Sequence, residues 1–196
     1  MALIFSGNNL LGGGFAPTGS HRFTLVVLGV SAAAALSGFV AHEMAHKVAA
    51  QRRGYWAEFR ASPYGLMMAL VSSYIGFILA APGATMVGGM SEVEARNWGR
   101  TSLAGPMTNA VFSAAFYAAS IGAFLLGSSL TLWLLVLAFI NGWFGTFNLF
   151  PFGLLDGRKV YRWSPGVWAA SIALTSAATI VSMLALNVYA SPFLGF

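Results

Sequence analysis

An apolar stretch, residues 23–41, constrains the fold of this chain more than any other feature, because it contains no charged residue. About 20 such residues can cross the hydrocarbon core of a bilayer as a helix. The stretch runs directly into the motif H-E-M-A-H at residues 42–46, so both belong to one predicted helix, Phe23–Gln51. Ionisable groups inside a membrane segment are rare and mark functional sites. The sequence therefore predicts a membrane protein with a buried polar site.

The spacing of the motif points to a metal. His42 and His46 are one helical turn apart, so both imidazoles lie on one face and can bind the same zinc ion. Glu43 is then directed at the open coordination position, where a water would be activated. The alternative is a chance match or a structural buried histidine. The chain has only three histidines and five acidic residues, which disfavours that alternative.

Composition supports the membrane assignment. The chain is 58% hydrophobic and 8% charged, whereas about a quarter of the residues of a soluble domain are charged. We expect one membrane-embedded domain over residues 1–196, in contact with the lipid bilayer. The basic residues lie at the ends of apolar segments, where they anchor helices, so the net charge of +5 does not indicate a nucleic-acid partner. The absence of cysteine excludes thiolate ligands and disulfides.

The hydrophobic pattern predicts an all-α, polytopic transmembrane helix bundle. Residues 1–20 are interrupted by glycine and proline and are expected to form an interfacial arm. The predicted helices cover Phe23–Gln51, Thr101–Leu126, Leu130–Phe150 and Gly166–Tyr189.

Residues 64–90 are ambiguous, and the basic residues decide how we interpret them. If residues 64–81 do not cross the membrane, every basic residue except Arg22 lies on one side. The positive-inside rule favours that arrangement. We therefore expect a re-entrant segment after the motif helix in a multi-pass protein of the cell membrane. The site would lie nearer the cytoplasmic side.

A catalytic zinc usually has three protein ligands, so one more is needed. His21 lies at the far end of the motif helix. Asp156 follows a helix that returns to the basic side, which puts it at about the depth of His46. Its alternative role is a helix cap. The remaining acidic candidates lie in charged loop segments: Glu58, Glu92 and Glu94.

Three motifs in this order resemble the site-2 protease family of intramembrane zinc metalloproteases. Residues 42–46 are similar to the family's H-E-x-x-H, and residues 148–157 are similar to its N-x-x-P-x-x-x-L-D-G. Residues 104–109 resemble the small-residue motif on the helix between them. The resemblance spans residues 42 to 157 and does not include the PDZ or CBS domains of some relatives.

The resemblance implies a role for each matched residue. His42, His46 and Asp156 would bind one zinc ion per chain, and Glu43 would activate water. Asn148 would contact the substrate or the oxyanion.

The resemblance also implies an extended strand that enters the membrane near residues 75–87. Its edge could pair with an unwound substrate and satisfy the backbone groups that lipid leaves unpaired. We expect Leu79, Ala84 and Val87 to contact the substrate.

Other polar and small residues of the bundle are interpreted structurally. Asn109 and Asn141 are expected to form hydrogen bonds between helices, and Gly105 is expected to allow close helix packing.

The expected function is hydrolysis of peptide bonds within or next to the transmembrane segments of other proteins. Two alternatives remain open. One is a membrane zinc transporter or sensor without hydrolytic activity, and the other is a membrane-bound protease whose site opens to the cytosol. Glu43 discriminates against a transporter, because transport does not need an acid that is not a ligand. The oligomeric state is not predicted.

Overall fold

The computed structural model describes residues 21–67, 83–89 and 94–194. In chain order the labelled elements are α1 (His21–Ala34), the π-helix η1 (Ala35–Val40), α2 (Ala41–Gln51), β1 (Trp56–Ala61), β2 (Gly83–Gly88), α4 (Ala95–Leu125), α5 (Leu130–Asn148), α6 (Asp156–Trp163) and α7 (Pro165–Leu194).

The chain is an all-α polytopic membrane protein with a small sheet. Four helical segments are long and apolar enough to cross a membrane: Leu25–Gln51, Ala95–Leu125, Leu130–Asn148 and Pro165–Ser191. They correspond to the four predicted helices.

The largest error in the predicted boundaries concerns α4, which begins at Ala95 and not at Thr101. Arg96 and Arg100, which precede the predicted start, lie in the first turns of this helix. The predicted helix over 130–150 ends at Asn148, and the helix predicted over 166–189 extends from Pro165 to Leu194.

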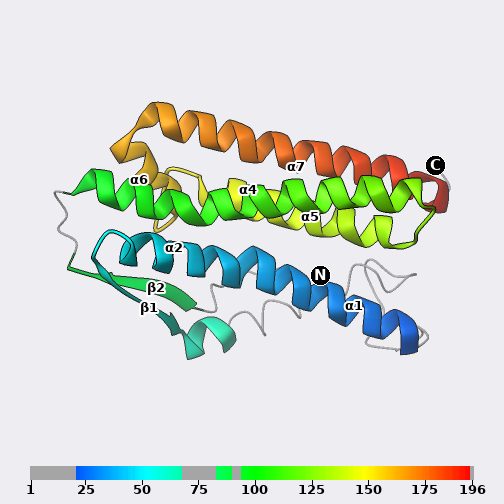
Figure 1. Cartoon of the computed structure of the whole chain (residues 1–196), viewed down its shortest axis with the longest axis horizontal. Helices are drawn as coiled ribbons and strands as arrows, with labels where there is room; N and C mark the ends of the chain where they lie inside the picture. Colours follow the sequence, from blue (N-terminus) through cyan, green and yellow to red (C-terminus); the bar gives the residue numbers. More distant parts are fainter. Residues whose placement is uncertain (1–20, 68–82, 90–93, 195–196) are drawn as a thin grey trace.

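The helices pack in layers around α4 and α5. Helix α4 packs against α5 on one side and α2 on the other, and α5 also packs against α7. Figure 1 shows this order, with α7 uppermost, α4 and α5 in the middle, and the α1–η1–α2 helix below them. The motif helix therefore lies directly against α4, which brings α4 into the candidate site.

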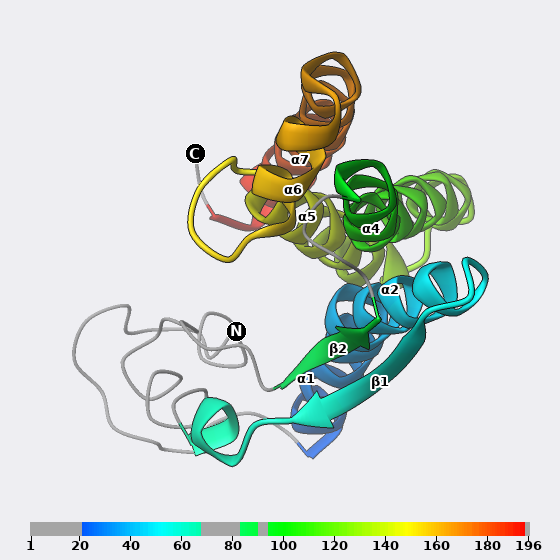
Figure 2. The same ribbon diagram turned by 90° about the vertical axis from the view of Figure 1, so that its left-hand side faces the viewer.

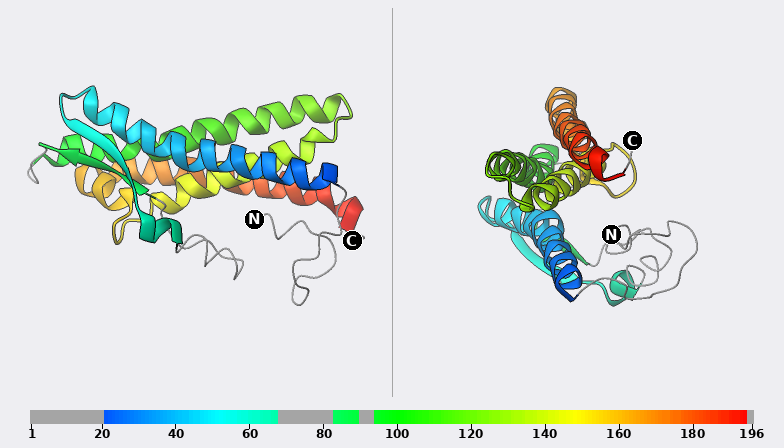
Figure 3. Two further views of the ribbon diagram at one scale, coloured as in Figure 1. Left: turned by 90° about the horizontal axis from the view of Figure 1, so that it is seen from below. Right: turned by 90° about the vertical axis from the view of Figure 1, so that its right-hand side faces the viewer.

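The basic residues gather at one end of the bundle. The end of α2, the start of α4, and α6 all lie at the same end in Figure 1, while the start of α1, which carries Arg22, lies at the other. The left-hand view of Figure 3, which shows the bundle from below, agrees. The chain thus leaves the bundle after Gln51 and re-enters at Ala95 on the same side. This fits a segment that returns without crossing, although residues 68–82 lie outside the described part of the chain.

Strands β1 and β2 form a two-stranded antiparallel sheet, with a register that runs from Trp56 opposite Gly88 to Ala61 opposite Gly83. Figure 2 shows the sheet beside α2. The β2 strand confirms a β-structured segment after the motif helix, whereas β1 was not predicted. The predicted part of the strand before residue 83 lies outside the described residues.

An aromatic contact fixes how the sheet lies along the helix. The rings of Phe59 and Phe39 meet edge to face with centroids 6.1 Å apart. Phe39 precedes His42 by about one helical turn. The sheet therefore extends from the end of α2 back along the membrane-spanning segment as far as the motif.

The bundle is held together largely by small and polar contacts, while many large apolar side chains face outward. Ser113 Oγ donates to the carbonyl of Ala138 across α4 and α5 at 2.8 Å. The Thr146 and Thr179 hydroxyls are 3.1 Å apart across α5 and α7. This distribution is typical of helices packed within lipid, where small residues allow close approach and polar groups bond across the interface.

Candidate metal centre

Two helices bring the three predicted ligands together. The Nε2 atoms of His42 and His46 are 3.0 Å apart, and Asp156 Oδ2 lies 3.2 Å from the first and 3.0 Å from the second. A tetrahedral zinc ion with bonds of about 2.0–2.1 Å separates its ligand atoms by roughly 3.3 Å. All three side chains are buried or nearly so. The three atoms could hold one zinc ion.

The hydrogen bonds of the imidazoles determine which nitrogens are free. His42 Nδ1 donates to Asn109 Oδ1 at 2.5 Å, and His46 Nδ1 donates to the backbone carbonyl of Thr101 at 2.8 Å. Because both partners are carbonyl-type acceptors, the proton of each neutral ring lies on Nδ1 and the lone pair on Nε2. Two lone pairs and a carboxylate oxygen of Asp156 therefore converge on one point. This donor set suits a divalent cation.

A π-helical turn immediately precedes the motif and helps to position His42. The Gly38 carbonyl in this turn accepts a hydrogen bond of 2.9 Å from Asn109 Nδ2, and Asn141 Nδ2 donates to Ser37 Oγ at 3.0 Å. Asn141 Oδ1 in turn accepts from Asn109 Nδ2 at 3.3 Å. Such π-turns are frequent at functional sites. Here the turn supplies the acceptors that orient the amide bonded to His42.

Asp156 reaches the histidines because α6 starts close to the end of α5. A Cβ atom at Gly157 would collide with the Leu149 carbonyl, so only glycine allows this approach. The same carbonyl accepts a 2.7 Å hydrogen bond from Trp168 Nε1, which ties α7 to the turn between α5 and α6. Leu155 occupies the N-cap position without a side-chain cap bond. The Asp156 carboxylate thus faces the imidazoles and is not the helix cap of the alternative interpretation.

The electrostatic environment keeps Asp156 charged. Burial on its own raises the pKa of this carboxyl, but the neighbouring His46 and His42 outweigh burial and lower the pKa below its ordinary value. The group is therefore an anion at neutral pH, which is the form that binds a metal.

Gly105 of α4 lies against the ligand atoms themselves. A Cβ atom at this position would approach His46 Nε2 to 2.5 Å and His42 Nε2 to 2.6 Å. Gly105 therefore allows a close approach between helices, as predicted. The groups that approach it are the imidazoles of His42 and His46. The absence of a side chain leaves space beside the point where the three ligand atoms converge.

Glu43 is held by the sheet and is not part of the ligand group. Thr85 N–H donates to Glu43 Oε2 at 2.7 Å, and the Thr85 hydroxyl donates to the Glu43 backbone carbonyl at 2.8 Å. In an antiparallel pair, alternate residues direct their peptide groups toward the partner strand. Since Thr85 N–H reaches Glu43, the peptide groups of Thr85 point away from β1. The outer edge of β2 therefore faces Glu43 on the motif helix.

None of the remaining predicted site residues that the structure describes has a hydrogen bond to the three ligand side chains. Asn148 is the last residue of α5, and its amide donates to the Phe144 carbonyl at 2.9 Å. Ala84 is exposed opposite Arg60, and Val87 is half-buried opposite Ala57. Their substrate roles, like that of Asn148, stay predictions. Leu79 lies outside the described residues.

Comparison with known proteins identifies the family. The chain is 34% identical over 150 residues to a protein of Methanocaldococcus jannaschii named "Putative zinc metalloprotease", and the match covers 76% of this chain and 77% of that protein. The chain belongs to this zinc metalloprotease family. No family model matches the chain, and no solved structure matches it. The His42, His46 and Asp156 group fits the metalloprotease assignment.

Sequence reasoning missed three groups that support the site. Asn109 was expected to bond another helix, and it does, but its acceptor atom orients a histidine of the motif. Its place in the motif at residues 104–109 was the available signal. No sequence signal marked Thr101 or Thr85. The first acts through its backbone carbonyl and the second through its backbone N–H, and such contacts depend little on residue type.

Proposed function

We propose that this chain is an intramembrane zinc metalloprotease of the site-2 protease type, which hydrolyses peptide bonds within or next to transmembrane segments of other membrane proteins. One observation carries the proposal. Two of the three converging ligands, His42 and His46, belong to the membrane-spanning segment Leu25–Gln51, and the third, Asp156, approaches from the corner after another span. A peptide bond that reaches this cluster would lie at the depth of the membrane-spanning segment, about two helical turns from its basic end.

The chain supplies the groups that amide hydrolysis needs. A zinc ion held by His42, His46 and Asp156 would polarise the scissile carbonyl and acidify a bound water. The Glu43 carboxylate takes a proton from the attacking water. The water oxygen forms the new bond to the carbonyl carbon, and Glu43 returns the proton to the leaving amine as the C–N bond breaks. The Thr85 N–H fixes the carboxylate beside the cluster.

The outer edge of β2 is the surface on which we propose that the substrate unwinds. The peptide groups of Gly83 and Val87 point away from β1, by the alternation of the ladder, on either side of Thr85, whose N–H is already bonded to Glu43. An extended substrate segment that adds to this edge satisfies its own backbone groups, which lipid cannot do. The same edge holds Glu43, so a paired segment would run past the catalytic groups.

The placement of Glu43 supports hydrolysis over metal transport or sensing. Its carboxylate accepts the Thr85 N–H and is not one of the three ligands. We therefore predict that Glu43→Gln abolishes cleavage and retains zinc, because the amide cannot accept the water proton. Zinc content by atomic spectroscopy and cleavage of the same preparation test this prediction. Loss of zinc in this variant would support a transporter or sensor.

The proposed activity is tested with the purified full-length protein in detergent or vesicles and a panel of single-pass membrane proteins. Products are mapped by mass spectrometry, with and without a zinc chelator, and with Glu43→Gln as the matched inactive control. Cuts inside or next to the transmembrane segment, lost in both controls, support the proposal. Cuts confined to soluble domains would contradict it and support a site that opens to the cytosol.

A further inference from the structure

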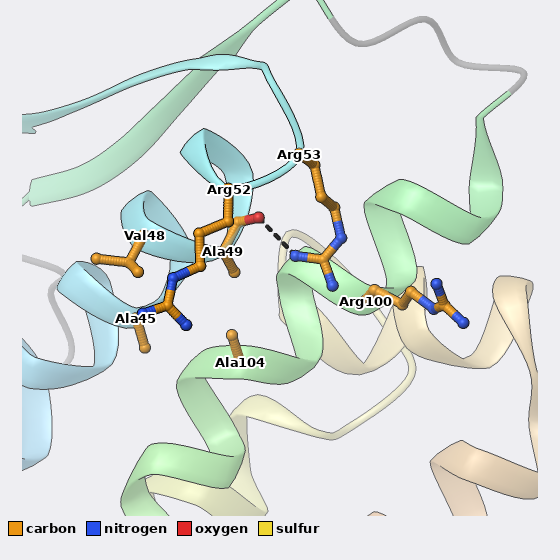
Figure 4. A pocket seen from close by; sticks show the side chains of 7 residues that line it. All are labelled: Ala45, Val48, Ala49, Arg52, Arg53, Arg100 and Ala104. Carbon is orange, nitrogen blue, oxygen red and sulfur yellow. Dashed lines mark hydrogen bonds between the residues drawn. The ribbon is translucent and has the colours of Figure 1, made fainter.

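A cavity of about 570 Å³ lies between α2 and α4 at the basic end of the bundle. Figure 4 shows it from close by, lined by three arginine side chains and by small apolar side chains of α2 and α4. The metal ligands do not line this cavity, but two of its lining residues are neighbours of the metal site in the chain. Ala45 precedes His46 on α2, and Ala104 precedes Gly105 on α4.

The rim of the cavity is strongly cationic. Arg52, Arg53 and Arg100 line it, and none of them pairs with a carboxylate of residues 21–67, 83–89 or 94–194. Two of the three are held in place by other contacts. Arg53 Nη1 donates to the Ala49 carbonyl at 2.5 Å, and the Arg100 guanidinium lies 5.7 Å from the centroid of the Trp163 ring. Three guanidinium groups without a paired anion form a site for a negatively charged ligand.

The floor of the cavity has the opposite character. It consists of small apolar side chains, Ala45, Val48, Ala49 and Ala104. Ala45 lies inside the membrane-spanning segment Leu25–Gln51, and Arg52 follows its last residue. The seven residue-to-residue steps from Ala45 to Arg52 cover ~10 Å of helix axis. The cavity therefore passes from charged to apolar over the distance that separates a bilayer's headgroups from its hydrocarbon.

We propose that this cavity binds one anionic phospholipid. Its phosphate lies among the guanidinium groups, where arginine forms bidentate hydrogen bonds to phosphate oxygens. Its glycerol and first acyl carbons lie against the alanine-rich floor. A lipid with net negative charge is favoured over a zwitterionic one, because the ammonium group of the latter would enter a rim that already carries three positive charges.

The test compares two triple variants with the same change in net charge at the same end of the bundle. Arg52→Gln/Arg53→Gln/Arg100→Gln removes the rim of the cavity. Arg158→Gln/Lys159→Gln/Arg162→Gln removes three charges from α6, outside the cavity. Full-length protein is titrated in detergent with phosphatidylglycerol or phosphatidylcholine, and bound lipid is counted by native mass spectrometry.

The expected result is one retained phosphatidylglycerol in the wild type and the α6 variant, with at least tenfold weaker binding in the rim variant and for phosphatidylcholine. Equal loss in both variants would overturn the proposal in favour of general surface attraction. Excess glycerol phosphate is added as a competitor. Full displacement of the lipid by this headgroup alone would show a site for free phosphate and would also contradict the proposal.

A second variant keeps the test valid if the rim variant does not fold. Ala104→Phe fills the floor and leaves all three arginines in place. It should weaken phosphatidylglycerol binding at least tenfold, while Val111→Phe, at an exposed position on the same helix, should not. Unchanged lipid retention in folded Ala104→Phe protein would overturn the proposal. Because every readout is lipid binding, the outcome is independent of whether the chain proves to be a protease.

Discussion

At the scale of single residues, the candidate site depends as much on atoms that cannot bind a metal as on those that can. Asn109 holds one imidazole through its side-chain oxygen, and the backbone of Thr101 holds the other. Each contact directs a lone pair toward Asp156. The partners that orient metal ligands are typically worth 10–100-fold in affinity or activity, so these residues are testable separately from the ligands.

We predict that Asn109→Ala lowers zinc affinity by about 10–100-fold without unfolding the protein, because His42 loses the acceptor that fixes its tautomer. Competition with a chromogenic chelator measures the affinity. Thr108→Ala is the matched control, since the Thr108 hydroxyl bonds only within its own helix, to the Ala104 carbonyl at 2.9 Å. An affinity equal to that of the wild type in Asn109→Ala would show that the amide does not position His42.

Gly105 gives a second prediction at this scale. Gly105→Ala should abolish zinc binding, because the new methyl group would lie within 2.6 Å of both Nε2 atoms and within the space of the ion. Gly122→Ala on the same helix is the control, as a Cβ there meets nothing within 4 Å. Zinc content per chain and helical circular dichroism are measured together. Full zinc occupancy in folded Gly105→Ala protein would contradict the assigned geometry.

At the scale of elements, the proposed mechanism gives the sheet the task of holding a substrate beside the candidate metal cluster. Strand β1 occupies one edge of β2, and α2 lies along the sheet with Glu43 bonded to the other edge. Proline removes a backbone N–H. Its effect on β2 therefore depends on which way the replaced N–H points.

Val87→Pro removes an N–H that points away from β1, by the same alternation that directs Thr85 N–H to Glu43. We predict that it reduces cleavage at least tenfold while zinc content is unchanged, because a paired substrate would lose a hydrogen-bond donor on this edge of β2. Val87→Ala keeps the N–H and serves as the control. Cleavage at the wild-type rate by Val87→Pro would exclude pairing at this position.

At the scale of the whole molecule, positive charge is concentrated at one end of the bundle. The described basic residues of α2, α4 and α6 lie at one end of the bundle, and the turn between α4 and α5 lies at the other (Figure 1). The positive-inside rule predicts that the first end faces the cytoplasm.

The chain has no cysteine, so single-cysteine variants report this orientation without background. Gly166→Cys at the start of α7 should be labelled only after the membrane is permeabilised, whereas Ser129→Cys in the turn between α4 and α5 should react with an impermeant maleimide in intact cells. Both positions are exposed in the fold. The reverse labelling pattern would place the basic end outside.

The sequence by itself determined the spans, the motif and the identity of the three converging side chains. Long apolar runs and the i, i+4 spacing of His42 and His46 are properties of local chain geometry, and the return of the chain to the basic end limited the third ligand to Asp156. Only the tertiary structure decided what surrounds them. The hydrogen bonds of Asn109, Thr101 and Thr85 join segments far apart in the chain, and two of them use backbone groups that nearly every residue type carries. A pattern of residue types cannot encode such contacts, because they arise only when the helices and the sheet have packed.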